Sequence, residues 1–201
     1  MSDSPAEQRH HDRMARKKAV VDEKIARATI ARGVLVVHTG TGKGKSSAAF
    51  GVLARALGHG QQAAVVQFVK GRSDTGEEAF FRGHAAVRWH VMGEGFTWET
   101  QDAERDRVAA RQAWDCAARY LADPTINLLV LDEITYAFKY GWLEVDAVLA
   151  ALAARPPMQH VILTGRGAPS ALVAAADTVT EMGLVKHAFQ GGVQAMPGLE
   201  F

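Results

Sequence analysis

Short apolar runs alternate along this chain with longer segments in which apolar residues recur every three or four positions. The runs have the length of buried strands and cover residues 33–38, 63–69, 86–92, 126–131, 160–164 and 178–182. Strands that are apolar along their whole length are typical of parallel sheets with both faces covered. The pattern therefore predicts an α/β fold with a mostly parallel sheet and helices on both faces.

The segments between the runs have helical periodicity. We expect helices over residues 45–57, 101–121, 145–154 and 168–175. In the longest of these, one face is formed by small or aromatic residues, namely Ala109, Ala113, Cys116, Ala117 and Tyr120. Cys116 is therefore expected to be a buried apolar residue rather than a nucleophile.

The two ends of the chain differ from this alternation. Residues 1–31 are rich in charge, and their apolar positions follow spacings of three and four, which indicates a partly apolar helix. We expect an N-terminal helical arm over 1–31 and a single α/β domain over 32–201. From His187 onward, glycine and proline predict an irregular closing loop.

Composition narrows the classes of function. The 201 residues include 23 Lys and Arg against 22 Asp and Glu, so no strong charge favours nucleic acid or an anionic membrane. The longest apolar runs are far too short to cross a bilayer. The single cysteine cannot form an internal disulfide, and the eight histidines lack the spacing of zinc ligands. We expect a cytoplasmic protein without protein-bound zinc.

A glycine-rich loop follows the first apolar run, where residues 39–46 read TGTGKGKS. Phosphate binding needs inward-pointing backbone amides, a lysine and a hydroxyl at a helix N-terminus. The segment matches G-x-x-x-x-G-K-[ST] except that Thr39 stands at the first glycine, and Lys43 is an additional cation. A glycine-rich turn between two core elements is the alternative. The expected ATP-binding residues are Thr39, Gly40, Thr41, Gly42, Lys43, Gly44, Lys45, Ser46 and Ser47.

An acidic pair, Asp132 and Glu133, follows the fourth apolar run. Ligands of open α/β sheets bind at the carboxyl ends of the strands, where such carboxylates hold the magnesium shell of bound phosphates. We expect Ser46, Asp132 and Glu133 to hold Mg²⁺ through these phosphates. The pair could instead cap the following helix. Taken alone, these motifs define only a nucleotide site.

Residues 33–71, which read GVLVVHTGTGKGKSSAAFGVLARALGHGQQAAVVQFVKG, closely resemble the opening of the ATP:corrinoid adenosyltransferases of the CobA/BtuR/CobO type. Further similar segments follow in family order at 92–98 (MGEGFTW), 130–141 (VLDEITYAFKYG), 161–167 (VILTGRG) and 185–189 (VKHAF). The resemblance covers nearly all of residues 33–201. Thr41 and Ser46 stand where asparagine and threonine are frequent.

The resemblance implies a RecA-like P-loop fold and an enzyme of cobalamin biosynthesis or salvage. Such an enzyme transfers the 5′-deoxyadenosyl group of ATP to the cobalt(I) of a corrinoid, such as cob(I)yrinic acid a,c-diamide, and releases tripolyphosphate. It further implies Mg²⁺, a homodimer in which the N-terminal helix can cover an active site, and a flavoprotein-type reductase as partner.

The resemblance also implies catalytic roles for Lys45, Phe96, Trp98 and Glu133. Cobalt(I) is a strong nucleophile, so the reaction needs alignment and a stabilised leaving group rather than a side-chain base. Phe96 and Trp98 would face the lower side of the corrin and displace the axial ligand of cobalt(II), although both could be core aromatics. Arg166, between two glycines, would meet the ATP phosphates or remain a solvated loop arginine.

Two other classes of function fit the glycine-rich loop. A nucleotide kinase or a hydrolytic ATPase would transfer the terminal phosphoryl group to an acceptor or to water. A non-catalytic ATP-binding switch of the recombinase-like sort would bind nucleotide without turnover, with the N-terminal arm pairing subunits. Product analysis and the visible absorption of a bound corrinoid distinguish these alternatives.

Overall fold

The computed structural model describes residues 4–69, 75–92 and 103–200, and the chain divides into two compact units, Met1–Arg32 and Gly33–Phe201. The first unit is built on one helix, α1 (Pro5–Arg27), which is shorter than the expected arm and has no buried residue. Ser4 Oγ accepts a hydrogen bond from Glu7 N at 3.3 Å, and Glu7 Oε2 accepts one from Ser4 N at 2.6 Å. This reciprocal capping box explains why the helix begins at Pro5.

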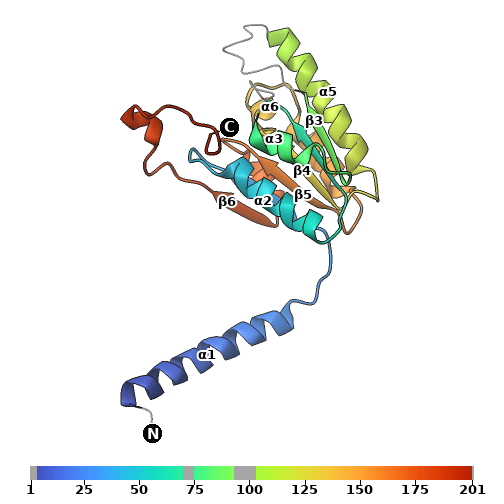
Figure 1. Cartoon of the computed structure of the whole chain (residues 1–201). Helices are drawn as coiled ribbons and strands as arrows, with labels where there is room; N and C mark the ends of the chain where they lie inside the picture. The colour runs from blue at the N-terminus through green and yellow to red at the C-terminus, as the bar shows by residue number, and fades with distance from the viewer. Residues whose placement is uncertain (1–3, 70–74, 93–102, 201) are drawn as a thin grey trace. The chain divides into compact units, whose positions relative to one another are not determined.

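The second unit contains a parallel sheet, which confirms the expected α/β class. The strands lie in the order β3-β2-β4-β5-β1-β6 (Figure 1). Their bounds are β1 Leu35–Thr39, β2 Ala63–Gln67, β3 Val87–Val91, β4 Leu128–Asp132, β5 His160–Thr164 and β6 Thr178–Glu181. Because every pair is parallel, the carboxyl ends of the strands meet at one edge of the sheet.

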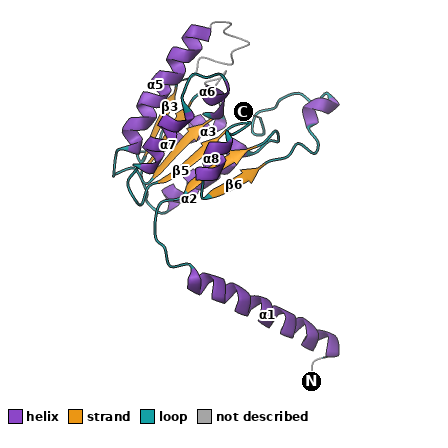
Figure 2. Cartoon of the chain, turned by 180° about the vertical axis from the view of Figure 1, so that it is seen from behind, coloured by secondary structure: helices purple, strands orange, loops and turns teal. Residues whose placement is uncertain are grey.

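Helices cover both faces of the sheet. One face carries α2 (Lys45–Gly58) and α3 (Gly76–Phe81), and the other carries α5 (Ala103–Leu121), α7 (Val145–Ala153) and α8 (Ser170–Ala175) (Figures 1 and 2). Successive residues of each strand point to opposite faces. In β4, for example, Leu129 and Leu131 join the core with α5, whereas Leu128 and Val130 join the core with α2.

Within the described residues, three short elements were not expected from the sequence. They are α3, α6 (Thr135–Lys139) and the 3₁₀ helix η1 (Ala188–Gly191), which interrupts the expected closing loop. Each is too short to show a helical period, which explains why the apolar pattern missed them. Cys116 is buried on α5, as expected. No helix within the described residues has the length and apolar character needed to span a membrane.

Candidate active site

The glycine-rich loop connects β1 to α2 at the carboxyl edge of the sheet. Gly44 immediately precedes α2 with φ 107°, a left-handed conformation that disfavours any side chain. Thr39 is the last residue of β1 and not part of the turn, and its Oγ1 accepts a hydrogen bond from Ala168 N at 3.1 Å. The first position of the motif therefore needs no glycine here, because the turn begins at Gly40 (φ 97°).

Lys45 begins α2 and lies inside the loop. Its side chain is buried, and Nζ donates a hydrogen bond to Gly42 O at 2.7 Å. Burial lowers the pKa of Lys45, and the charge of Glu133 opposes this shift. The ammonium group of Lys45 is thus held inside the loop by a hydrogen bond to a backbone carbonyl of the same loop.

The acidic pair at the end of β4 is organised by a threonine from the neighbouring strand. Thr164 Oγ1 donates a hydrogen bond to Asp132 Oδ1 at 2.7 Å and accepts one from Glu133 N at 2.9 Å. Gln67 Nε2 donates to the other oxygen of Asp132 at 3.0 Å. Thr164 is the last residue of β5, which lies beside β4 in the sheet, and it therefore bridges Asp132 and Glu133. The sequence did not indicate this role for Thr164.

Glu133 is held in an unusual state. Its φ is 60°, and its Oε2 is buried and accepts no hydrogen bond from any described residue. Burial and the neighbouring Asp132 raise the pKa of Glu133 to about 7, against the opposing effect of Lys45 and Arg166. An oxygen without a partner fits a metal ligand, because a cation bound there would offset the cost of burying the carboxylate.

A cavity of about 450 Å³ lies over the glycine-rich loop. It is lined by Gly42, Lys43, Gly44, Lys45, Ser46, Ser47, Glu77, Glu133, Tyr136, Arg166, Leu199 and Glu200. Most of the expected site residues thus meet in one place. Thr39, Gly40, Thr41 and Asp132 are not among the lining residues. Phe96 and Trp98 lie outside the residues that the structure describes.

Arg166 is exposed but still contributes to this cavity. It follows the last residue of β5 by two positions, and its charge acts on Lys45, Glu133 and Tyr136. Tyr136, from α6, is half-buried and lines the same cavity, and burial raises its pKa. Sequence reasoning missed four residues that line the cavity, because they come from segments without any phosphate-binding pattern. These residues are Glu77, Tyr136, Leu199 and Glu200.

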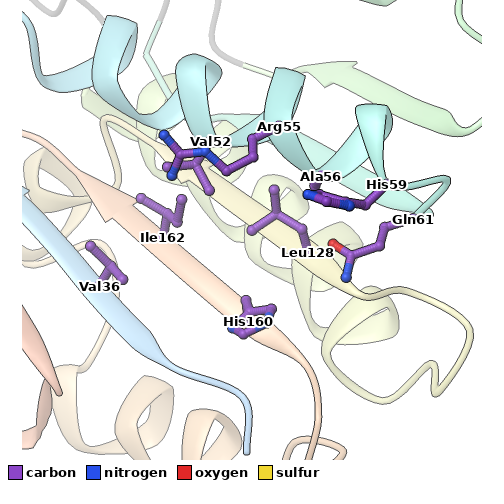
Figure 3. A pocket seen from close by; sticks show the side chains of 9 residues that line it. All are labelled: Val36, Val52, Arg55, Ala56, His59, Gln61, Leu128, His160 and Ile162. Atoms are coloured by element: carbon purple, nitrogen blue, oxygen red, sulfur yellow. The ribbon is translucent and has the colours of Figure 1, made fainter. Parts of the chain in front are cut away.

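A second cavity of about 200 Å³ lies between α2 and the sheet (Figure 3). Its floor is apolar, with Val36, Leu128 and Ile162 from three strands, and Arg55 and His59 approach from α2 and its C-terminal end. None of the expected site residues lines it. The loop cavity is therefore the candidate active site.

The chain is similar along its length to known protein families and to individual relatives. The family described as ATP:corrinoid adenosyltransferase BtuR/CobO/CobP matches residues 31–201, and the family described as cob(I)alamin adenosyltransferase N terminal matches residues 1–25. The chain is 63% identical to the corrinoid adenosyltransferase of Pseudomonas aeruginosa, with 100% of both chains covered. It is 45% identical to the corrinoid adenosyltransferase CobA of Salmonella typhimurium, with 98% of this chain and 100% of the relative covered.

Proposed function

This chain belongs to the ATP:corrinoid adenosyltransferase family BtuR/CobO/CobP and is itself a corrinoid adenosyltransferase, and we propose that it releases the phosphates of ATP as intact tripolyphosphate. In this proposal the cobalt(I) of the corrinoid attacks C5′ of ATP. A cobalt–carbon bond forms with two electrons from the metal, and the bond from C5′ to the α-phosphate oxygen breaks. Tripolyphosphate leaves with that bonding pair.

The observation that supports this proposal is the convergence of loop residues, Arg166 and Glu133 on one cavity of about 450 Å³. We propose that the glycine-rich loop is the phosphate loop of a RecA-like P-loop fold. Backbone amides at the start of α2 and the ammonium of Lys45 would bind the triphosphate. Charge that develops on the leaving group would then be stabilised by groups already in place.

We propose that magnesium is the metal bound at this site. The Ser46 hydroxyl at the start of α2 and the buried Glu133 carboxylate would hold it, and Asp132 would act from behind through its fixed hydrogen bonds. A bound Mg²⁺ supplies positive charge that neutralises the phosphate oxygens. Glu133 would release its proton when the cation binds, since a carboxylate must be ionised to act as a ligand.

The corrinoid-facing residues remain a proposal carried by the sequence. Phe96 and Trp98 would pack on the lower face of the corrin and remove the axial ligand of cobalt(II), which favours reduction. Replacing both with alanine should slow adenosylation from cobalt(II) much more than from chemically generated cobalt(I). Equal losses from the two starting states would refute this assignment.

The setting of the reaction is also proposed. We infer a cytoplasmic homodimer that receives electrons from a flavoprotein-type reductase and acts in cobalamin biosynthesis or salvage, with cob(I)yrinic acid a,c-diamide as one candidate acceptor. A titration of corrinoid intermediates, compared by kcat/KM, would identify the acceptor. Sedimentation of the purified chain with and without ATP would test the dimer.

The central test is product analysis. The purified protein should be incubated with ATP, Mg²⁺, a reductant and cob(I)alamin, and the phosphate products separated by ion exchange. We expect adenosylated corrinoid and tripolyphosphate in equal amounts. ADP with phosphate, or nucleotide binding without any product, would instead support the kinase, ATPase or switch alternatives.

A further inference from the structure

The C-terminal segment leaves the glycine-rich loop after β6 and returns to it near the end of the described chain. Where it leaves, Gly42 N donates a hydrogen bond to Met182 O at 2.7 Å. A Cβ at position 42 would lie only 2.6 Å from Gly183 O, so the loop packs directly on this strand end. Where it returns, the Glu200 carboxylate forms an ion pair with Lys43 of the same loop. Figure 1 shows this excursion in red.

The return is ordered by a turn of its own. Glu200 N and Leu199 N both donate to Met196 O, at 3.0 and 3.3 Å, and Gly198 has φ 83°. Leu199 lines the candidate active cavity and two cavities beside it. The tail segment 196–200 is therefore part of the active-site wall, and Glu200 is its charged member.

The charge of Glu200 is unexpected for a cavity that binds phosphates. Three cationic side chains, Lys43, Lys45 and Arg166, line the cavity, but so do the carboxylates of Glu77, Glu133 and Glu200. Glu133 is the proposed metal ligand. Glu200, in contrast, neutralises one of the loop cations directly.

A lysine ammonium is a compact point charge that can pair with a carboxylate or with a phosphate oxygen. A polyphosphate in this cavity would meet Lys43 already engaged by Glu200, and the two anions would repel each other. The side chains of the pair are 48% and 21% exposed, so the interaction is weak enough to be exchanged.

We propose that Glu200 is a positioning residue that competes with tripolyphosphate for Lys43 and so promotes release of this product. The inference rests on the proposed function, because it takes the loop to be the site of the triphosphate. It assigns the tail a part in turnover: the carboxylate re-forms its pair with Lys43 as the polyanion departs.

The test is a double-mutant cycle on the full-length protein, with tripolyphosphate and Mg²⁺ as the probe in titration calorimetry. Glu200→Gln should bind tripolyphosphate about two- to fivefold more tightly than the wild type, the range expected for loss of one partly exposed competitor. In the Lys43→Met background the same substitution should change the Kd by less than about 1.5-fold. Glu144→Gln, which removes an exposed carboxylate that does not line the cavity, is the matched control.

Steady-state kinetics give a second measurement. Faster product release in the wild type predicts that Glu200→Gln lowers both kcat and the KM for ATP. An unchanged Kd in Glu200→Gln would overturn the inference. An equal tightening of tripolyphosphate binding in the wild-type and Lys43→Met backgrounds would also overturn it. General repulsion between the Glu200 carboxylate and the polyanion would then explain the effect. If the wild type fails to bind tripolyphosphate at all, the proposed function itself is wrong.

Discussion

Gly165 packs against Thr135 so closely that a Cβ at position 165 would lie 2.0 Å from Thr135 Oγ1. Gly165 also has φ 138°, and Thr135 is fully buried. This contact joins the end of β5 to α6, directly before Arg166. It therefore fixes the point at which the arginine enters the candidate active site.

Gly165→Ala should destabilise the protein by roughly 2–4 kcal/mol, because the new methyl group overlaps a buried side chain and φ is unfavourable. Gly167→Ala is the control, since position 167 has φ 66° but nothing within 4 Å of a new Cβ. It should lose only about 1 kcal/mol. Urea denaturation measures both, and equal losses would show that the contact with Thr135 does not matter.

Lys45→Met should lower the affinity for ATP by about 100-fold or more and nearly abolish adenosylation, because it removes a charge-assisted contact to the triphosphate. A methionine of similar volume keeps the site packed, so the melting temperature should change little. Lys43→Met, which removes an exposed lysine from the same loop, should cost much less affinity. A normal rate in Lys45→Met would contradict the proposed role of the loop.

Glu133→Gln should stabilise the protein in a pH-dependent way. The folded pKa of about 7 lies above the ordinary value of 4.5, so the wild type loses stability as pH rises through this interval. The glutamine should therefore add up to roughly 3 kcal/mol at pH 8 and almost nothing at pH 4. Adenosylation should fall in the same variant. A stability gain independent of pH would refute this explanation.

The buried His38 should give folding stability the opposite pH dependence. Both of its ring nitrogens are buried without a hydrogen-bond partner among the described residues, and burial lowers its pKa. The unfolded chain then binds a proton more readily, so stability falls as pH drops below about 6.5. His38→Leu should reduce this acid sensitivity, as measured by melting temperature between pH 8 and pH 5. An unchanged acid sensitivity would exclude His38 as its source.

The apolar runs were sufficient to predict the strands, because the four inner strands β1, β2, β4 and β5 are buried along nearly their whole length and contrast with their flanks. The edge strand β6, in contrast, is exposed along its whole length. The expected strand 160–164 agrees with β5 at both ends. The order of the strands was not accessible, since nothing in the sequence places β5 between β4 and β1. For the same reason the threonine that connects the acidic pair could not be found.

Motif reasoning located the parts of the site that are contiguous in sequence. The loop around Lys45 and the acidic residue Glu133 were both expected, and both line one cavity. Glu200 was not, because it reaches the loop from a distant part of the chain through a single ion pair. Such contacts depend on the path of an irregular segment. An irregular segment has no hydrophobic periodicity from which that path could be predicted.

Cys116 is the only cysteine of the chain, and it is buried on the core-facing side of α5. A maleimide reagent applied to the folded protein should therefore find no reactive thiol. One cysteine introduced at the exposed Val193 would accept a fluorophore without removal of the native residue. Any movement of the C-terminal segment during a catalytic cycle thus becomes observable, in real time, by site-selective fluorescence.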